Sequence, residues 1–363
     1  MLDAKLQQGM GERLAQALRM VAPGTPLREG IDNIIRAKTG SLIILGKEKE
    51  ISFLFSGGLR LDREFSPNVV YELAKMDGAT ILNHGATRIL RANVQLMPDP
   101  AIESSETGTR HRTAERVAKQ TEALAISISQ DRDVVSLYID NVKYVLSDMR
   151  VLLAKSDQAL QTLEKYRNRL DQLADNLTSL EFEDAVTLHD VIGVVQRNEM
   201  VARVAREIEW YLIELGSEGR LIAMQLDELM TGVAKDRKAL LRDYLPARGP
   251  KLEKAEARIR ELSADELFET DIVSKILGYK KKAKASEVRL NPRGYRILNK
   301  VPKLPSQVID NIVARLGSLQ ALLLAGEDDL VAVEGVGRVR AREIAESLVQ
   351  LRELSLSEKY SFR

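Results

Sequence analysis

Two short segments carry side chains suited to phosphate chemistry. Asp77-Gly78-Ala79 sets a carboxylate beside a glycine, and the stretch TGTRHRT at Thr107–Thr113 sets two arginines and a histidine after Gly108. A glycine permits a tight turn, the first N–H groups of a helix bind anions, and an arginine donates charge-assisted hydrogen bonds to phosphate. We expect Thr109 to cap the helix that follows. The second segment therefore predicts a cradle for a triphosphate group.

Short strands and helices alternate around these two segments. Helical patterns cover the N-terminus, Asn68–Met76 and Arg110–Thr121. Apolar residues that recur with period two between Ser41 and about Leu146 predict the strands SLIILG, ISFLFSGG, ATILN, TRILRANVQL, LAISISQ, VVSLYID and VKYVL. We therefore expect the first region to be a mixed β-sheet flanked by helices.

Two serines in one of these strands extend the polar set. Ser127 and Ser129 lie two residues apart, so both hydroxyls project from the same face of the strand LAISISQ. A hydroxyl can donate to or accept from the oxygens of phosphate or sugar. Both serines therefore join the candidate site.

After residue 146 the apolar spacing becomes helical. A heptad seam with alternating steps of three and four residues runs along one long helix and consists of Leu163, Tyr166, Leu170, Leu173, Leu177 and Leu180. The seam is buried either in a helical bundle, which we favour, or in an extended coiled coil. Farther on, the stretch from Tyr279 to Lys303 holds nine basic residues and one acid, Glu287, which indicates a solvated linker or a surface that touches nucleic acid.

The C-terminal segment LVAVEGVGRVRAREIAESL places Gly335, Val336 and Gly337 between two helical patterns. Glycines on either side of an aliphatic residue allow a tight hairpin whose N–H groups can bind a phosphate oxygen at the start of the next helix. Arg338 and Arg340 follow within reach of neighbouring phosphates. The segment resembles the helix-hairpin-helix motif of DNA repair and recombination proteins, and the alternative is a plain glycine-containing turn. These five residues are the predicted DNA contacts.

Asp-Gly-Ala together with TGTRHRTAER, at this spacing, closely resembles the diadenylate cyclase family, in the form that adds a helical linker and a helix-hairpin-helix terminus. The likeness covers essentially the whole chain. It implies a multidomain α/β plus all-α fold, with a cyclase domain at residues 1–146, a helical spine at 147–290 and a helix-hairpin-helix domain at 291–363. It also implies condensation of two ATP molecules into cyclic di-adenosine monophosphate with release of two pyrophosphates, using Mg²⁺ or Mn²⁺.

The resemblance further implies roles for individual residues. Asp77, Arg110, His111 and Arg112 would be catalytic, and Asp77 and His111 would hold the metal ion. The residues that would bind ATP are Asp77, Gly78, Ala79, Leu96, Thr109, Arg110, His111, Arg112, Thr113, Ser127 and Ser129. Where the family usually has a glycine after the helix, this chain has Glu122, so we expect the turn that leads to both serines to differ.

The composition narrows the chemistry. The chain lacks cysteine and has three histidines among 363 residues, which excludes thiol nucleophiles and Cys-based zinc sites and leaves phosphate, magnesium and carboxylate chemistry open. Lys plus Arg total 54 against 53 Asp plus Glu, so any DNA-binding surface must be local. No apolar run reaches the roughly 18 to 20 residues of a membrane span, and we expect a cytoplasmic, nucleoid-associated protein with no membrane contact.

Symmetry adds an expectation about assembly. Joining two ATP molecules twice, 3′ to 5′, requires two identical sites that face each other. We therefore expect a homo-oligomer with paired cyclase domains, and an octamer as the full assembly. The expected partners are ATP as substrate and DNA, above all branched junctions. The alternative is a protein that binds DNA structures and whose N-terminal domain only senses ATP; the Asp77 carboxylate favours the catalyst, since a sensor does not need it.

Overall fold

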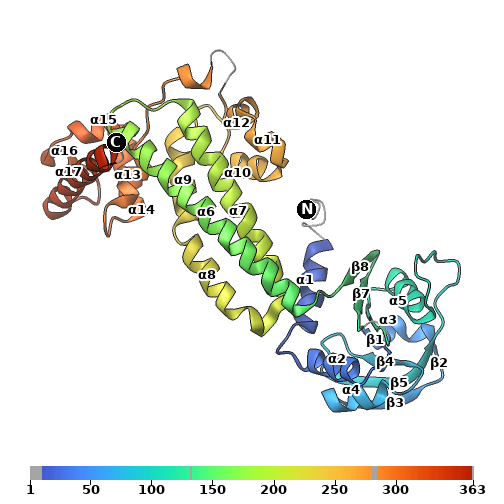
Figure 1. Ribbon diagram of the computed structural model, residues 1–363. Helices are drawn as coiled ribbons and strands as arrows, with labels where there is room; N and C mark the ends of the chain where they lie inside the picture. Colours follow the sequence, from blue (N-terminus) through green and yellow to red (C-terminus); the bar gives the residue numbers. More distant parts are fainter. Residues whose placement is uncertain (1–9, 131–132, 280–283, 362–363) are drawn as a thin grey trace. The chain divides into compact units, whose positions relative to one another are not determined.

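The computed structural model describes residues 10–130, 133–279 and 284–361, and Figure 1 traces the chain as a ribbon. The chain forms two compact units, Met1–Gln158 with Ile208–Met224, and Ala159–Glu207 with Gln225–Arg363. The division between them falls inside three helices, α6, α7 and α8, rather than in loops. The three domains expected from the sequence stay a prediction.

The first unit contains a mixed sheet that has eight strands in the described part of the chain. Its strands follow the order β2-β5-β4-β1-β6-β7-β8, and β3 also pairs with β5. Only β1 and β4 are parallel among the described pairs. The elements are α1 (Met10–Val21), α2 (Pro26–Arg36), β1 (Ser41–Leu45), α3 (Glu48–Ile51), η2 (Ser52–Leu54), β2 (Phe55–Ser56), β3 (Leu59–Glu64), α4 (Pro67–Leu73), β4 (Ala79–Leu82), β5 (Arg88–Leu96), α5 (Thr109–Gln120), β6 (Leu124–Ile128), β7 (Val135–Ile139) and β8 (Val142–Val145).

Helices cover both faces of this sheet (Figure 1). Side chains of β1 alternate between two cores: Ile43 and Leu45 pack with α1, α2 and α4, whereas Leu42 and Ile44 pack with α3 and α5. Because both faces are buried, the central strands β1, β4 and β6 are apolar or small along their whole length. The mixed sheet flanked by helices, expected from the sequence, is confirmed.

The stretch ISFLFSGG is the main exception among the predicted strands. Residues Glu48–Ile51 and Ser52–Leu54 form α3 and η2, and only Phe55–Ser56 is strand. Ile51 and Leu54 are the buried pair, and their spacing of three residues places them on one face of a helical turn, whereas in a strand they would point to opposite faces. Strand β3 was not expected because its sequence LRLDRE is mostly polar and exposed, as edge strands often are.

The C-terminal end of α7 returns to the first unit. Glu214 accepts hydrogen bonds from the Tyr144 hydroxyl (2.6 Å) and from the Ser147 N–H (2.5 Å). Trp210 and Ile213 pack against the core on the α1 face of the sheet. The sheet core is therefore completed by residues that follow the last strand, β8, by more than 60 positions in the sequence.

The remaining elements are helical. They are α6 (Met149–Phe182), α7 (Leu188–Leu215), η3 (Gly216–Gly219), α8 (Arg220–Met230), α9 (Val233–Tyr244), α10 (Leu252–Glu261), α11 (Ala264–Phe268), α12 (Thr270–Ile276), η4 (Ala285–Glu287), α13 (Tyr295–Lys300), α14 (Ser306–Leu316), α15 (Leu319–Leu324), α16 (Glu327–Val331) and α17 (Arg338–Ser361). Across the described residues, every helix is too short or too polar to span a membrane.

The predicted heptad seam lies on α6. Leu163, Leu170 and Leu177 are buried by the chain's own helices, and Arg197 of α7 stacks on the ring of Tyr166 at 5.2 Å. Figure 1 shows α6 and α7 running side by side. The bundle is therefore the right interpretation of the seam, and the extended coiled coil is not needed to bury it.

Helices α13 to α17 pack around a core of their own, which includes Phe182 at the end of α6. Part of the predicted basic stretch belongs to this packing. Arg296 is 7% exposed and its Nη1 lies 2.6 Å from Glu181 Oε1, and Arg293 donates to two backbone carbonyl oxygens at the end of α9. The expectation of a solvated stretch is wrong for these two arginines, because they satisfy buried acceptors. Lys280–Lys282 lie outside the described residues.

Candidate active site

The predicted nucleotide-binding residues converge on one edge of the sheet. β1 and β4 begin at this edge, whereas β5 and β6 run antiparallel to them and end there. Asp77 shortly precedes β4, Leu96 is the last residue of β5, and Ser127 is the last but one of β6. The start of α5 reaches the same edge, because Arg110 lies against Gly40, which precedes β1. Segments far apart in sequence therefore meet in one place.

Gly78 is enclosed by the neighbouring strand. A Cβ at this position would lie 2.3 Å from the carbonyl carbon of Asn93, so only glycine fits. The Gly78 N–H donates to Asn93 Oδ1 (3.0 Å), and Asn93 itself has a left-handed φ of 55°. The adjacent Asp77 is exposed, and its carboxylate forms no hydrogen bond or ion pair with the described residues. The backbone is fixed and the carboxylate is left open.

The N-terminus of α5 has no side-chain cap. Gly108 is the N-cap residue and Thr109 is the first residue of the helix, so the prediction that Thr109 caps it is wrong. The first backbone hydrogen bond runs from the Arg112 N–H to the Gly108 carbonyl (2.9 Å), and Thr113 follows half-buried. Because Gly108 has no side chain that could accept from the N–H groups of the first turn of α5, these backbone donors stay open to an anion.

The two arginines of this segment are placed differently. Arg110 is half-buried, and a Cβ at Gly40 would lie 2.0 Å from its Nη1, so the glycine makes room for the guanidinium. No carboxylate of the described residues forms an ion pair with Arg110. Arg112 is exposed and donates to the carbonyl oxygens of Glu106 (3.4 Å) and Thr107 (3.1 Å). Arg110 is thus free for a phosphate, whereas Arg112 holds the loop before the helix.

His111 lies in the first turn of α5 and faces the sheet. Its Nδ1 lies 2.9 Å from the hydroxyl oxygen of Tyr138, and the two rings meet edge to face with their centroids 6.2 Å apart. Burial raises the pKa of the Tyr138 hydroxyl above its usual value, and the charge of Glu106 raises it further. The phenol therefore keeps its proton at neutral pH, and this pair joins the start of α5 to the sheet.

Of the two serines, Ser127 is fully buried, and its Oγ has no hydrogen-bond partner among the described residues. Ser129 is half-buried, and its N–H donates to the Val134 carbonyl (2.9 Å). A buried hydroxyl without a partner costs roughly 1–3 kcal/mol, a cost that a water, an ion or a bound substrate group would remove. Ser127 is therefore a polar side chain held ready at the edge where the other candidates meet.

Glu122 leaves the strand that carries these serines undisturbed. The Thr121 hydroxyl donates to the Val117 carbonyl (2.7 Å) and accepts from the Ala123 N–H (3.2 Å), which closes the turn before β6. β6 then keeps a regular register with both β1 and β7. The exchange of a glycine for Glu122 therefore does not displace Ser127.

Two of the predicted ATP contacts are core residues. Ala79 is 3% exposed and Leu96 is 9% exposed, and both pack in the core beneath α5. Leu96 also pairs with Phe55 of β2. These two apolar side chains can form part of the wall of an adenine site, but they do not project from the core to contact the base.

Sequence reasoning missed four residues that shape this edge: Gly40, Asn93, Glu106 and Tyr138. The first two offered a signal, since a glycine directly before a strand and an asparagine inside one both mark unusual backbone. The other two offered none, because a loop carboxylate and a strand tyrosine are common. Only the fold shows that Tyr138 meets His111 and that Glu106 is paired with Lys143 of the neighbouring strand.

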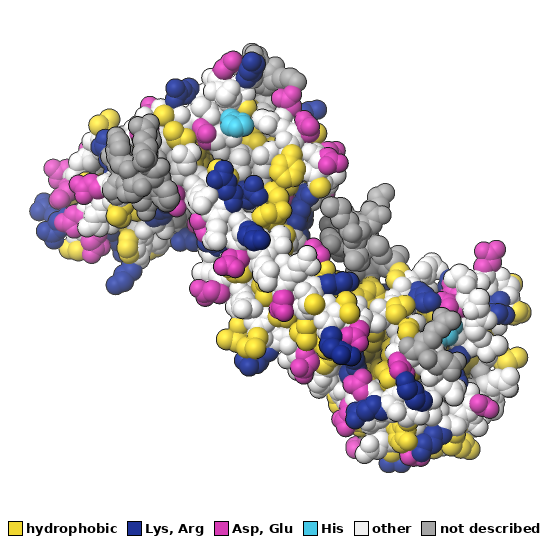
Figure 2. All heavy atoms as spheres, viewed as in Figure 1, with side chains coloured by type: hydrophobic (Ala, Val, Ile, Leu, Met, Phe, Trp, Pro, Cys, Tyr) yellow, Lys and Arg dark blue, Asp and Glu magenta, His cyan; other side chains and the backbone are white. Residues whose placement is uncertain are grey.

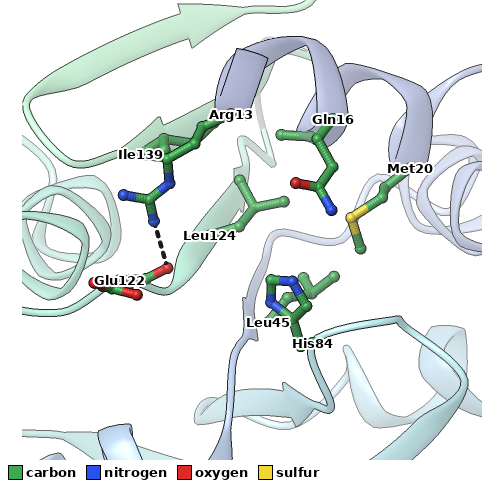
Figure 3. A pocket seen from close by; sticks show the side chains of 9 residues that line it. Arg13, Gln16, Met20, Leu45, His84, Glu122, Leu124 and Ile139 are labelled. Atoms are coloured by element: carbon green, nitrogen blue, oxygen red, sulfur yellow. Dashed lines mark hydrogen bonds between the residues drawn. The ribbon is translucent and has the colours of Figure 1, made fainter. Parts of the chain in front are cut away.

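A hollow at the opposite edge of the sheet lies away from these residues. Leu45 ends β1, Ile139 ends β7 and His84 lies in the turn between β4 and β5, and they line it together with Arg13 and Glu122. Figure 3 shows the Arg13 guanidinium turned toward Glu122, whose backbone oxygen it contacts at 2.9 Å. Arg13 also forms an ion pair with a carboxylate in the turn between β7 and β8. Its charge is already paired, so this hollow is not the candidate site.

The predicted DNA contacts lie in the turn between α16 and α17 and in the first turn of α17. Gly335 has a left-handed φ of 86°, and Val336 is 5% exposed in the core of the C-terminal helices. Gly337 is exposed, and a Cβ there would meet nothing within 4 Å. Arg338 is exposed, while Arg340 donates to the Gly335 carbonyl. The turn thus has an apolar anchor and an outward surface at Gly337 and Arg338.

Comparison with known proteins assigns the chain to a family. The family model described as "DisA bacterial checkpoint controller nucleotide-binding" matches residues 28–142, and the one described as "DisA bacterial checkpoint controller linker region" matches residues 146–286. The DNA integrity scanning protein DisA of Clostridium perfringens (strain 13 / Type A) is 51% identical over 344 residues, which are 94% of this chain and 96% of that protein. This chain belongs to the DisA family.

Other DisA relatives agree. The protein of Carboxydothermus hydrogenoformans is 52% identical and that of Frankia alni 49% identical; each alignment covers 94% of this chain, and 97% and 96% of those proteins. The crystal structure of DacA from Staphylococcus aureus is 22% identical and covers 39% of this chain and 91% of that one, with a TM-score of 0.28 that supports no argument about the fold. The family resemblance drawn from the sequence is confirmed, and with the DisA family the chain is a diadenylate cyclase, a nucleotidyltransferase. The interpretation as a mere ATP sensor is set aside.

Proposed function

We propose that this DisA-family cyclase condenses two ATP molecules into cyclic di-adenosine monophosphate and releases two pyrophosphates. The observation that supports this most is the convergence at one sheet edge of the Asp77 carboxylate, the N-terminus of α5 and Arg110, none of which is capped or ion-paired by a side chain of the described residues. Phosphoryl transfer depends on such parts, because catalysis there consists mainly of positioning and of stabilising charge on the phosphate oxygens.

Each part has its own role. The N–H groups at the start of α5 and Arg110 bind the triphosphate and stabilise the charge of the departing pyrophosphate. Asp77 lies beside the ribose 3′-hydroxyl and accepts its proton as the oxygen attacks the α-phosphate. Ser127 and Ser129 hydrogen-bond phosphate or sugar, and Leu96 lines the adenine. Gly78 has its N–H engaged by Asn93 and contributes the close approach of backbone to substrate.

A divalent cation, Mg²⁺ or Mn²⁺, fits these donors. Asp77 offers a carboxylate oxygen and His111 an imidazole nitrogen, and such ions commonly take the rest of their ligands from substrate phosphates and water. The described residues hold no group of three His, Asp or Glu side chains able to bind an ion by themselves, so the triphosphate and water would have to supply the remaining ligands. When bound, the ion adds positive charge near the α-phosphate and favours loss of the 3′-hydroxyl proton.

Ring closure requires two copies of the site. We infer a homo-oligomer in which two cyclase domains face each other, with an octamer as the full assembly. Phe53 and Met97 support a contact near the site, because they are 64% and 61% exposed beside the β2–β5 pair that ends at Leu96. Dilution tests this step: activity per protomer should fall as light scattering reports dissociation, with ATP kept saturating. Full activity in a monomer would contradict the two-site geometry.

Product analysis tests the reaction itself. The purified chain is mixed with ATP and Mg²⁺ or Mn²⁺, the nucleotide product is identified by mass spectrometry, and pyrophosphate is quantified. We expect a cyclic dinucleotide with two pyrophosphates released per ring, and no product when a chelator removes the ion. ADP or a linear dinucleotide as the only product would contradict the proposed condensation.

We also propose that DNA, branched junctions above all, binds the turn from Gly335 to Arg338 and represses the cyclase. Figure 2 shows Lys and Arg side chains intermixed with Asp and Glu over the visible face. This face therefore offers no broad positively charged surface, and DNA would need a local binding site. N–H and arginine contacts to phosphate carry little sequence information, so binding should follow DNA shape and fall steeply with salt, with a log–log slope of about −0.9 per neutralised phosphate. Several such turns in one assembly would favour branched over linear DNA.

Two glycine variants separate the fold of this turn from its contact with DNA. Gly337→Val meets nothing within 4 Å, so it should leave the hairpin intact and block the approach of a phosphate. Gly335→Val forces a β-branched residue to a φ of 86° and should disrupt the hairpin itself. Junction binding and repression should be lost in both, with basal synthesis unchanged. If Gly337→Val binds junctions with the original salt slope, the basic stretch before α14 becomes the leading candidate.

A further inference from the structure

A charged pair lies beside the N-terminus of α5. Lys143 Nζ, on β8, lies 2.5 Å from Oε1 of Glu106, and the two side chains are 43% and 14% exposed. The same Nζ lies 5.9 Å from the ring centre of Tyr138, whose hydroxyl oxygen lies 2.9 Å from Nδ1 of His111 in the first turn of α5. The pair is therefore close to the helix end where we expect the triphosphate to bind.

Glu106 is a natural competitor for that helix end. It precedes the N-cap residue Gly108 by two positions, and its carbonyl oxygen accepts from Arg112 Nε at the end of the first turn (3.4 Å). A negative charge is stabilised at a helix N-terminus, because the free N–H groups carry partial positive charge there. Asp243 shows this at α13, where it accepts from three N–H groups at 2.7–2.8 Å. A carboxylate in the same place on α5 would exclude the phosphates of ATP.

The backbone of the loop before α5 is held independently of the charged pair. Arg116 of α5 donates to the carbonyl oxygens of Pro100 (3.0 Å) and Ile102 (2.8 Å). One turn earlier, Glu115 Oε2 accepts from the Ser105 N–H (3.1 Å). Side chains of α5 therefore fasten this loop along the helix. Loss of the lysine charge would free the carboxylate of the pair and leave the loop in place.

We propose that Lys143 is a positioning residue for the cyclase: it holds the Glu106 carboxylate against β8 and so keeps it from occupying the N-terminus of α5. Without this lysine the carboxylate moves to the positive end of the helix, where the N–H groups and Arg110 would bind the triphosphate. A group attached by a short flexible segment has an effective concentration on the order of millimolar, so it competes with ATP. This inference rests on the proposed function, because it takes the start of α5 as the phosphate site.

Steady-state kinetics of the full chain tests the competition. Lys143→Met keeps the length of the side chain and removes its charge, and Lys143→Gln does so with a shorter side chain. In both we expect KM for ATP to rise about 10-fold while kcat changes less than about twofold, because saturating ATP displaces a competing carboxylate. Lys143→Arg keeps the charge and should leave both constants within about twofold of native. A fall in kcat at unchanged KM would overturn the proposal.

A second change, at Glu106, separates competition from a loss of structure. The double variant Lys143→Met with Glu106→Gln has no carboxylate at this position, so its KM should return to within about twofold of native. An ion pair with a merely structural role behaves differently, because the double variant then stays as impaired as Lys143→Met. The proposal fails if the double variant is no better than Lys143→Met, or if Glu106→Gln alone raises KM as much.

Lys47→Met is the matched control. It removes an exposed ion pair with Glu50 (2.9 Å) beyond the far end of β1 and should leave KM and kcat unchanged; an equal rise in KM there would overturn the role of Lys143. Calorimetry with ATP gives the same comparison without turnover and includes Arg110→Ala. Unchanged affinity in Arg110→Ala would contradict the proposed phosphate site. Weaker binding in Arg110→Ala with native affinity in Lys143→Met would overturn the present inference alone.

Discussion

Two helices of this protein begin alike and have opposite surroundings at their N-termini. α5 and α13 each follow a glycine N-cap, Gly108 and Gly294, and each has an arginine in its first turn. At α13 the carboxylate of Asp243 accepts from the N–H groups of Gly294, Tyr295 and Arg296 at 2.7–2.8 Å. At α5 no side chain of the described residues caps the helix. One N-terminus is occupied by the protein and the other is open.

The charges around the two N-termini differ in the same way. Asp243 is 3% exposed, and its burial and the nearby charge of Glu181 raise its pKa to about 7. Arg296 is paired with Glu181. Arg110 at α5 has no such partner among the described residues. A helix end whose donors are satisfied internally fixes the fold, whereas one left open can bind a ligand. The short sequence pattern alone does not distinguish the two.

The largest effect is expected when the carboxylate that caps the N-terminus of α13 is removed. Asp243→Ala leaves three N–H groups, two of them buried, without this acceptor, and we expect the free energy of unfolding of the second unit to fall by about 3–5 kcal/mol. Urea unfolding measures the loss, and hydrogen exchange over residues 294–300 locates it. Asp310→Ala removes a more exposed ion pair with Arg242 and should cost less than about 1 kcal/mol. Similar losses in both variants would remove the contrast with α5.

The next effect concerns the open edge. Asp77→Asn keeps the size of the side chain and removes its basicity, so we expect turnover to fall at least about 100-fold while ATP binding stays largely intact. Steady-state kinetics and calorimetry measure the two quantities. The control is Asp62→Asn on β3, which removes the negative charge from an exposed ion pair with Arg88. Its turnover and ATP affinity should equal those of the native protein. Near-normal turnover in folded Asp77→Asn would take Asp77 out of the mechanism.

The two arginines of α5 sharpen the contrast further. Arg110→Ala should weaken ATP binding by about 10- to 100-fold, because a hydrogen bond to a charged group contributes roughly 1.5–3 kcal/mol. Arg112→Ala should weaken it less, since Arg112 donates to loop carbonyls, and the double variant should be weakest. Because Arg110 forms no ion pair with a carboxylate in the described part of the chain, its loss should leave the unfolding free energy within about 0.5 kcal/mol of native. Unchanged ATP affinity in Arg110→Ala would place the phosphate site elsewhere.

The smallest effect tests how fully the buried charges of the second unit are paired. Glu199 is fully buried and lies 2.8–3.2 Å from Arg203, Arg206 and Arg237. Burial disfavours its ionised form, but the hydrogen bonds and charges of Arg206 and Arg237 outweigh this and hold its pKa below the usual value. Because the folded pKa lies below the unfolded one, the ionised carboxylate adds stability above a pH of about 4.5, and this is lost as the pH falls through the folded pKa.

Glu199→Gln should therefore lower the unfolding free energy at pH 7, and this cost should shrink below about pH 4.5. Urea unfolding of both proteins at pH 7, 5 and 4 checks it. Glu256→Gln, which alters a longer contact with Arg237 at 3.5 Å, is the control and should show little dependence on pH. A cost for Glu199→Gln that is the same at all three pH values would contradict the pairing.

The strands and helices with a clear period could be predicted from the sequence, and the residues that act through tertiary contacts could not. TGTRHRT predicted the start of α5 because a glycine before a helical run has local consequences. Whether Arg112 reaches a phosphate or a loop carbonyl depends on the path of the chain before it. Likewise Arg296 belongs to a basic run in sequence, and only the packing of α6 and α9 against α13 shows that it is buried against Glu181.

The same limit applies to the orphan groups of the site. The spacing of Ser127 and Ser129 predicted a shared face, but the burial of Ser127 follows from the cover that α5 gives the sheet. Tyr138 lies in a strand pattern that predicts nothing beyond a core residue. Its contact with His111 joins positions 27 residues apart, and such long-range pairs are outside the reach of local periodicity.

Because the end of α7 packs against the sheet, the cyclase part of this chain is not one continuous stretch of sequence, and this affects how recombination can transfer it from one gene to another. A stretch cut at residue 146 holds every candidate nucleotide-binding residue, yet it lacks Glu214, Trp210 and Ile213 and leaves Tyr144 without its acceptor. In this chain the catalytic module is therefore discontinuous, and recombination that transfers it intact has to carry Ile208–Met224 as well. The spine between those two pieces is then inherited with the catalyst, so the segment that separates the cyclase from the C-terminal helices cannot be exchanged independently of it.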